Sequence, residues 1–338
     1  MLVFLWPGPG AYNRLPSFGL CLIKTTSYLK NDMNESLRSV LEERLGGAEL
    51  KTSELSEEIL RTRAEFNNVD ITLRGLMAKL GALRDAGYIF FRDIDVDIKG
   101  LSDRWHNIRR PLLSRLVTLD SWAREEIRSI RSSIEDARAY LRSGDAASAE
   151  ALTENVERLL AELEERVRSE VEEVRREIRS YVDRARELEG FLKLIETSLA
   201  ILREASFSLG PGEDLIFAAK SKMMDEEKIE GFFFMTDKRL LFEEAREVVV
   251  RRRFLFFAEK EIRRKLVLEL PLEEVTNMSK GIVGLLAGFG LKISLRSGRE
   301  LVFDLTGEEV DFVLRAFDYV RSGRADVDKR ALRSPAGS

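Results

Sequence analysis

The chain has 338 residues, of which 34% are charged and 44% hydrophobic, and its formal net charge is −4. This length is enough for two or three domains, and the high share of charged residues indicates long, solvated helices. Because the net charge is slightly negative, the chain as a whole does not attract nucleic acid or an anionic membrane, and any such attraction must be local.

The residue types that support catalysis or metal binding are scarce. The chain has one cysteine, Cys21, and one histidine, His106. An intrachain disulfide is therefore excluded. The chain also has too few cysteines and histidines to favour a Cys/His zinc site or a catalytic pair of nucleophile and base. Acidic residues are abundant, but they follow helical faces rather than a motif. We expect a cytoplasmic protein that is not an enzyme and that uses no cofactor or metal.

The first 32 residues are apolar but interrupted by prolines, and no run approaches the ~20 apolar residues that span a bilayer. They also lack the basic start and cleavage site of a signal peptide. Met33 is followed by Asn34, a residue type that caps helices. We predict that a helix starts there and that residues 1–32 are an irregular extension upstream of the native start. A short membrane-dipping anchor is the alternative.

Residues 33–206 have the apolar rhythm of a coiled coil. The strongest seam steps by threes and fours through Leu152, Val156, Leu159, Leu163, Val167, Val171, Val174 and Ile178, with Glu/Arg runs between. Residues that end or cap helices occur at Gly46–Gly47, Asp85–Gly87 and Ser143–Asp145. A turn near Gly100 is an alternative to the second break, and Pro111 kinks the second helix or marks its first turn. We predict a long antiparallel helical bundle or folded-back coiled coil, which serves as a spacer, an oligomerisation rod or an isolated bundle.

The apolar period changes from helical to strand-like at residues 210–212. Seven short runs rich in aromatic and β-branched residues follow, at 213–220, 229–236, 238–244, 247–257, 265–271, 290–297 and 299–306. Residues 307–322 have one apolar helical face. The expected fold is therefore α+β and multi-domain, with a small barrel over residues 207–322 that the last helix caps. We expect residues 323–338 to be a disordered tail.

One run in this region, EGFFFMTDKRLLFEE, carries a family resemblance. It resembles the core of GRAM and prokaryotic pleckstrin-homology-like domains through Gly231, Thr236, Asp237, Lys238, Arg239, Leu240, Leu241 and Phe242. The resemblance covers about a third of the chain and implies a split β-barrel that binds lipids, proteins or peptides. The loop AAKSKMMDEEK mixes lysines with acidic residues, and the last helix lacks the tryptophan common in eukaryotic members. Phosphoinositide recognition is therefore not carried over.

Two segments of this region are candidates for a binding surface. In RRRFLFFAEKEIRRK, residues 251–265, strand alternation places Arg251 and Arg253 on one face, and a basic hairpin loop follows with Lys260, Arg263, Arg264 and Lys265. Such a loop suits anionic lipid headgroups. The alternative is a solvated edge of the barrel, with nearby glutamates as partners.

The second segment, MSKGIVGLLAGFGLK, spans residues 278–292 and is expected to be an apolar, glycine-rich loop. It lacks the Gly-Lys-Ser/Thr ending of a phosphate loop. Lys280 and Lys292 flank the residues that would insert into a membrane or contact a partner, which are Ile282, Leu285, Leu286 and Phe289. The alternative is a loop packed onto the barrel or the bundle.

These features together favour a non-enzymatic adaptor or scaffold whose GRAM-like domain docks on a membrane surface or a partner protein. The alternative is a self-assembling coiled-coil protein that uses the barrel as an assembly contact. Lipid headgroups, a protein partner or a second copy of the chain are the expected partners, and nucleic acid is not expected, because no aromatic and basic platform is present.

Overall fold

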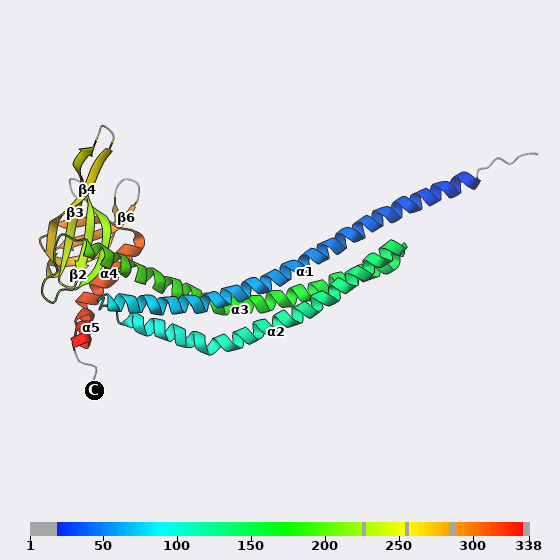
Figure 1. Cartoon of the computed structure of the whole chain (residues 1–338), viewed down its shortest axis with the longest axis horizontal. Helices are drawn as coiled ribbons and strands as arrows, with labels where there is room; N and C mark the ends of the chain where they lie inside the picture. Colours follow the sequence, from blue (N-terminus) through cyan, green and yellow to red (C-terminus); the bar gives the residue numbers. More distant parts are fainter. Residues whose placement is uncertain (1–18, 225–227, 254–256, 284–287, 334–338) are drawn as a thin grey trace, which may run out of the picture. The chain divides into compact units, whose positions relative to one another are not determined.

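The computed structural model describes residues 19–224, 228–253, 257–283 and 288–333. Its contacts divide the chain into two compact units. Each of the three long helices that Figure 1 labels α1, α2 and α3 contributes residues to both units. Unit 1 comprises residues 1–64 and 111–175, and unit 2 comprises residues 65–110 and 176–338. The predicted domain boundary between residues 206 and 207 lies inside unit 2 and stays a prediction.

Three long helices make up the first part of the chain: α1 (Gly19–Asp85), α2 (Asp93–Ser143) and α3 (Ala146–Arg203). The predicted breaks after α1 and α2 are present, where Gly87 and Gly144 adopt positive φ angles of 93° and 84°. The predicted break at Gly46–Gly47 and the alternative turn at Gly100 are both absent. Relative to alanine, the two glycines inside the helix lower its stability by about 2 kcal/mol. Burial of the neighbouring Leu41, Leu45 and Ala48 offsets this loss.

Two other predictions for the helical part differ from the structure. Helix α1 begins at Gly19 and passes through Asn34, so residues 19–32 are helical rather than irregular. Pro111 lies inside α2, so it does not mark the first turn of a helix. Whether residues 1–32 belong to the native protein stays a prediction.

The core of unit 1 is formed by one apolar stripe from each helix. Its fully buried members include Leu45, Ile130, Ala149, Val156 and Val167. The apolar seam of α1 is interrupted by polar residues such as Thr62, which is buried and donates its hydroxyl to the carbonyl of Glu58 at 2.9 Å. A threonine can therefore occupy this seam without an unsatisfied polar atom.

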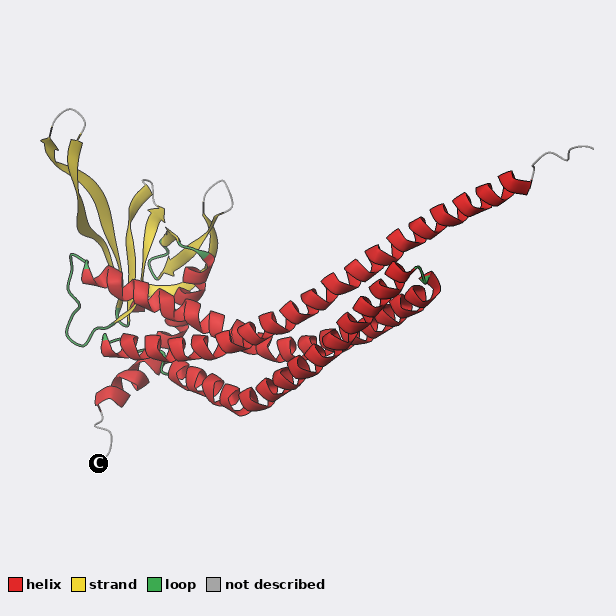
Figure 2. Ribbon diagram, turned by 45° about the vertical axis from the view of Figure 1, so that its right-hand side comes forward, coloured by secondary structure: helices red, strands yellow, loops and turns green. Residues whose placement is uncertain are grey.

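Unit 2 contains a seven-stranded antiparallel sheet (Figure 2). Its strands are β1 (Leu215–Met224), β2 (Lys228–Thr236), β3 (Arg239–Arg253), β4 (Phe257–Pro271), β5 (Val275–Val283), β6 (Gly288–Leu295) and β7 (Glu300–Asp304). The strand order is β4-β3-β2-β1-β7-β6-β5. A short 3-10 helix, η1 (Leu272–Glu274), follows β4, and α4 (Gly307–Arg321) and α5 (Arg324–Arg333) follow β7. No ladder joins β4 to β5 in the described ranges, so barrel closure stays a prediction.

Three parts of the sheet region differ from the predicted strands. The two strands expected at 238–244 and 247–257 are one continuous strand, β3. Strand β4 already begins at Phe257, so the basic hairpin loop expected around residues 260–265 is strand. The expected glycine-rich loop at 278–292 consists largely of β5 and β6, which pair from Val275↔Leu295 to Val283↔Gly288.

The glycine that opens the family-like run has a steric reason. A Cβ atom on Gly231 would lie 2.0 Å from the carbonyl oxygen of Glu243 on β3, a distance that no side chain can accept. The ladder between β3 and β4 also shifts register between Phe242 and Glu243. Glycine therefore permits the close approach of β2 and β3 at this irregularity.

Phenylalanines and one terminal helix form the core of the sheet domain. Phe217, Phe233, Phe242 and Phe303 are fully buried. Helix α4 begins with a capping box in which Thr306 and Glu309 bond reciprocally. It buries one apolar face, formed by Val310, Phe312, Val313, Ala316, Phe317 and Tyr319. The predicted C-terminal amphipathic helix is confirmed.

Candidate functional site

A buried ion pair at the start of the sheet domain involves two polar residues of the family-like run, Thr236 and Arg239. The Glu213 carboxylate accepts hydrogen bonds from Nε and Nη2 of Arg239 at 2.8 and 2.9 Å. It also accepts from Thr236 Oγ1 at 2.8 Å and from the N–H of Gly210 at 2.6 Å. Burial would raise the pKa of Glu213, but these hydrogen bonds outweigh burial and the pKa is lowered. The pair therefore fixes the β2–β3 turn and leaves few groups free for a ligand.

Helix α5 binds the same turn. Lys329 Nζ forms ion pairs with Asp237 and, at 2.8 Å, with Asp214, and it donates to the carbonyl of Gly212 at 2.8 Å. Burial would lower the pKa of Lys329, but the two carboxylates raise it. These bonds give a physical reason for residues 324–333 to form a helix rather than the expected disordered tail.

The linker between α1 and α2 is held against the sheet domain by buried hydrogen bonds. Tyr88 Oη donates to the carbonyl of Ile216 at 3.1 Å. The N–H of Phe91 donates to Tyr319 Oη at 3.1 Å, and that hydroxyl in turn donates to Asp328. Phe91 is fully buried and has a positive φ of 55°, which is a strained conformation for a phenylalanine. The linker therefore anchors the helical part of unit 2 rather than connecting it loosely.

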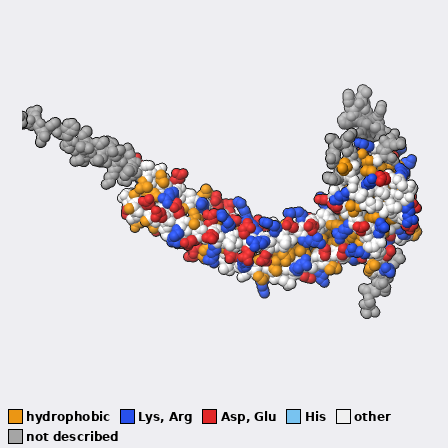
Figure 3. Space-filling model, turned by 180° about the vertical axis from the view of Figure 1, so that it is seen from behind, with side chains coloured by type: hydrophobic (Ala, Val, Ile, Leu, Met, Phe, Trp, Pro, Cys, Tyr) orange, Lys and Arg blue, Asp and Glu red, His pale blue; other side chains and the backbone are white. Residues whose placement is uncertain are grey.

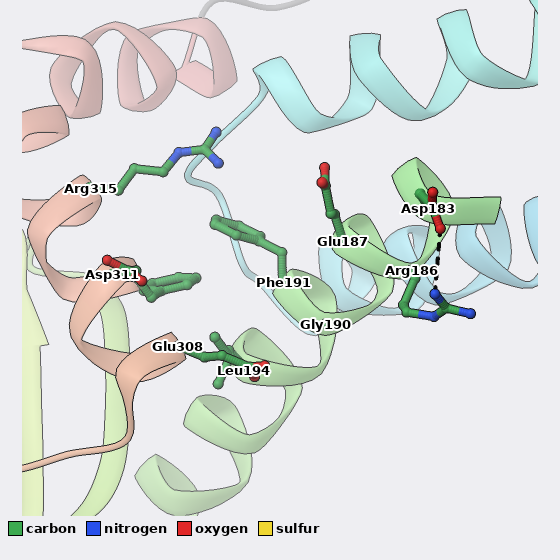
Figure 4. Close-up of a pocket in the computed structure, with 10 residues that line it drawn as sticks. Asp183, Arg186, Glu187, Gly190, Phe191, Leu194, Glu308, Asp311 and Arg315 are labelled. Carbon is green, nitrogen blue, oxygen red and sulfur yellow. Dashed lines mark ion pairs between the residues drawn. The ribbon is translucent and has the colours of Figure 1, made fainter. Parts of the chain in front are cut away.

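An open groove of about 570 Å3 runs between α3 and α4 (Figure 4). Gly190, Phe191 and Leu194 of α3 form its apolar part together with Phe312 of α4. The rings of Phe191 and Phe312 lie 4.5 Å apart, centroid to centroid. Charged residues from both helices surround this floor: Asp183, Arg186, Glu187, Glu308, Asp311 and Arg315. The volume lies within the range of ligand pockets.

The residues of the first predicted surface that the structure describes lie on β4. Arg263 and Lys265 are exposed, and neither forms an ion pair within the described part of the chain. Arg264 is instead largely buried, because its guanidinium stacks on Phe232 at 4.1 Å and donates to Glu204 at 2.5 Å. Arg264 therefore connects β4 to the end of α3 and is poorly placed to contact a membrane.

The second predicted surface lies on the β5–β6 hairpin. Ile282 is 76% exposed at the far end of β5. Lys280 forms an ion pair with Asp311 at 2.7 Å, and Lys292 forms one with Glu300 at 2.8 Å. Ile282 thus retains the exposed apolar character that was predicted, while the two lysines already have partners.

The side chains of several predicted surface residues lie outside the part of the chain that the structure describes. Arg251 and Arg253 belong to the backbone of β3, Lys260 to that of β4 and Phe289 to that of β6. Leu285 and Leu286 lie outside the described residues. Their predicted role in binding stays a prediction.

Charge on the helices is mixed, whereas the β3–β4 segment is basic. On the face that Figure 3 shows, Lys and Arg side chains alternate with Asp and Glu along the helices. Residues 245–265 contain eight Lys or Arg and three Glu, which gives this segment a formal charge of +5. The net charge of the whole chain, −4, conceals this local excess.

The groove between α3 and α4 was not predicted from the sequence. One signal was present, because Phe191 and Leu194 are apolar residues beside the main seam of α3, which continues through Leu188, Leu192 and Ile195. Their spacing indicates a second apolar stripe on the same helix. The sequence does not show which element lies beside that stripe, since α4 follows more than a hundred residues later.

The described residues contain no group of three or more His, Cys, Asp or Glu side chains placed to hold a metal ion. Within the same ranges, no helix is long and apolar enough to cross a bilayer.

Comparisons with known proteins do not assign a family. No family model matches the chain, and no curated protein matches it. Among solved structures, the C-terminal domain of an unknown protein from Leishmania infantum matches 32% of this chain and 86% of its own, with 11% identity and a TM-score of 0.23. A structure of Vav1 with an allosteric inhibitor and one of autoinhibited Vav1 each match 80% of this chain and 60% of their own, with 12% identity. Their TM-scores of 0.26 and 0.25 are too low to support an argument about fold or function.

Proposed function

We propose that this protein is a non-enzymatic adaptor whose sheet domain docks on an anionic membrane surface, with the long helices as a spacer. The observation that carries the proposal is the β3–β4 ribbon, which extends beyond the rest of the sheet. Pairing of β3 with β2 ends at Glu244, whereas pairing with β4 continues to Arg253↔Phe257. From residue 245 onward β3 pairs with β4 alone in the described ranges, and this two-stranded part of the ribbon carries Arg246, Arg263 and Lys265, whose side chains are exposed.

The register of the ribbon favours an external anion. Arg246 lies directly opposite Arg263 on the neighbouring strand, and like charges at such positions repel each other. An anionic surface would relieve this repulsion, and each basic residue near such a surface contributes about 1 kcal/mol of attraction. Glu244 forms an ion pair with Arg246 and offsets part of the charge on one strand.

The β5–β6 hairpin supplies an apolar contact in the same direction. Figures 1 and 2 show the β3–β4 ribbon and the β5–β6 hairpin projecting from the same side of the sheet, opposite α5. Ile282 on that hairpin and Ile262 on the ribbon are 76% and 62% exposed. Exposed isoleucines beside basic residues suit the boundary between headgroups and acyl chains.

The resemblance to GRAM and prokaryotic pleckstrin-homology-like domains supports the same proposal. Those domains mostly bind lipids, proteins or peptides, and the order of seven strands followed by a helix is compatible with a split barrel. Three polar residues of that run already have partners within the domain: Thr236 and Arg239 bond Glu213, and Asp237 pairs with Lys329. Binding is therefore assigned to the hairpins on the other side of the domain, not to this run.

Vesicle co-sedimentation tests the proposal. The full chain is expected to sediment with phosphatidylcholine vesicles that contain phosphatidylserine and not with phosphatidylcholine alone. Arg263→Glu with Lys265→Glu should abolish binding at low salt, and the effect should shrink at high salt, because salt screens exposed charges over ~10 Å at 0.1 M. The matched control is Lys99→Glu with Arg104→Glu, which makes the same charge change on α2 and should bind like the parent.

A second variant separates apolar from electrostatic contacts. Ile282→Ser should weaken binding at low and high salt alike, whereas Ile71→Ser, an equally small change at an exposed position of α1, should not. If the parent does not bind acidic vesicles, the membrane proposal is wrong. A mass that grows with concentration in light scattering would then favour the self-assembling scaffold.

A further inference from the structure

We infer that the groove between α3 and α4 is a second docking site, and that it accepts an amphipathic helix with apolar anchors and basic flanks from a partner protein. The inference is independent of the membrane proposal, because none of the residues that line the groove belongs to either hairpin. It rests on the spacing of the lining residues, on the groove floor and on the charges around it.

The lining residues form a continuous stripe on each helix. Those of α3 lie at 183, 186, 187, 190, 191 and 194, and those of α4 lie at 308, 311, 312 and 315. Both sets follow the i, i+3, i+4, i+7 pattern of a single helical face. Two such faces side by side form the kind of groove into which a third helix packs its own stripe.

The floor of the groove is apolar and leaves empty space that another side chain could fill. Phe191 and Leu194 are only partly buried, although Phe312 beneath them is buried. A Cβ atom on Gly190 would meet no heavy atom within 4 Å. A side chain from a partner therefore has room above Gly190 and would cover apolar surface that now faces water.

The charges around the floor select a basic partner. Four carboxylates line the groove, at Asp183, Glu187, Glu308 and Asp311, against two guanidiniums. Arg186 is paired with Asp183 at 3.5 Å, and Arg315 is paired with Asp93 at 3.2 Å and lies over the Phe191 ring.

Glu308 is the carboxylate best placed to receive a partner's cation. It has no ion pair within the described ranges, whereas Glu187 is paired with Arg184 and Asp311 with Lys280. A lysine or arginine on the partner helix would supply the missing cation, and an acidic helix would be repelled.

Binding of designed helices tests this inference. The probe is a fluorescein-labelled amphipathic peptide of about 15 residues, built from Leu on one face and Lys on the other, and the companion probe replaces each Lys by Glu. Fluorescence anisotropy with the full chain should show saturable binding of the Leu/Lys peptide and at least about tenfold weaker binding of the Leu/Glu peptide at the groove. Hydrogen exchange should show protection in residues 183–194 and 308–315.

A variant that fills the groove without breaking the fold decides the matter. Gly190→Leu places a side chain where the structure is empty, and it replaces a helix-interior glycine by a better helix former, so the melting temperature should stay equal or rise. Binding of the Leu/Lys peptide should fall at least about tenfold. Gly75→Leu is the matched control, since a Cβ on Gly75 of α1 also meets nothing within 4 Å, and it should leave binding unchanged.

Three results would overturn the inference. The first is no saturable binding of the Leu/Lys peptide. The second is binding that Gly190→Leu leaves unchanged, which would place the peptide elsewhere. The third is a loss of peptide binding by the Gly75→Leu control that equals the loss by Gly190→Leu. Glu308→Lys tests the charge at one exposed position. It should weaken binding of the Leu/Lys peptide and strengthen binding of the Leu/Glu peptide.

Discussion

Replacing Arg239 by methionine should destabilise the sheet domain severely. The side chain of Glu213 is 3% exposed and that of Arg239 is 20% exposed, so Arg239→Met would strand an almost fully buried carboxylate. Removing one partner of a buried ion pair costs about 3–5 kcal/mol. We expect about 3 kcal/mol, the lower end of that range, because the position of Arg239 lies close to solvent and water can reach the carboxylate.

Hydrogen exchange of the amides in β1, β2 and β3 is the appropriate assay. The chain has more than one compact unit, so its global unfolding is not expected to follow two states, whereas exchange reports the opening free energy of one region. Arg74→Met is the matched control, because Arg74 forms an exposed i, i+4 pair with Asp70 on α1, and its loss should change stability by less than about 0.5 kcal/mol.

The double variant Glu213→Met with Arg239→Met isolates the ion pair. It removes both charges, so it should be less destabilised than the sum of the two single variants. A loss below about 1 kcal/mol for Arg239→Met, or strict additivity in the double variant, would show that the pair is not the element that holds the β2–β3 turn.

Three further predictions follow from the same unit. Glu213→Gln should lower the free energy of unfolding at pH 7. The folded pKa of Glu213 lies below the ordinary value of 4.5, so the stability difference between the variant and the parent should disappear as the pH falls through that lowered pKa. A stability difference that acid leaves unchanged would contradict this prediction. Phe91→Ala should cost about 3–5 kcal/mol, and Phe91→Gly should cost no more than Phe91→Ala in thermal unfolding, since glycine tolerates the positive φ. Lys329→Met should accelerate hydrogen exchange in α5 at neutral pH, whereas Arg330→Met beside it should not, because the Nε of Arg330 donates to the carbonyl of Asp326 in its own helix.

The sequence predicted the elements that depend on local signals. The α+β class, the turns at Gly87 and Gly144 and the terminal amphipathic helix all follow from glycine positions and apolar periodicity within a few residues. Gly46–Gly47 has the same local signal as the true turns, but burial of neighbouring leucines keeps α1 continuous there. Local composition cannot weigh that burial.

The features that the sequence did not predict depend on contacts between distant segments. Strand β3 continues through a charged stretch because β4 pairs with it along its whole length. The sequence of α5 is typical of a polar tail, yet Lys329 binds Asp237, which lies in a turn 92 residues earlier. The sequence indicates that Arg264 is a surface charge, although the structure places it against Glu204 and Phe232. The groove likewise requires α3 and α4 to lie together, which no single segment reveals.

The anchoring of the α1–α2 linker has a consequence for how the protein is made. Its hydrogen-bond partners Tyr319 and Asp328 lie 228 and 236 residues further along the chain than Phe91 and Arg92. During synthesis the linker, with Tyr88, Phe90 and Phe91, therefore leaves the ribosome long before the residues that bury it. Until the last strands and helices emerge, these aromatic side chains remain uncovered and available to chaperones and proteases. A nascent chain that stops before Tyr319 and Asp328 would thus lack both side chains that hold the backbone of the linker, while α3 would still contact the sheet through bonds such as that of the Ser198 hydroxyl to Ala218.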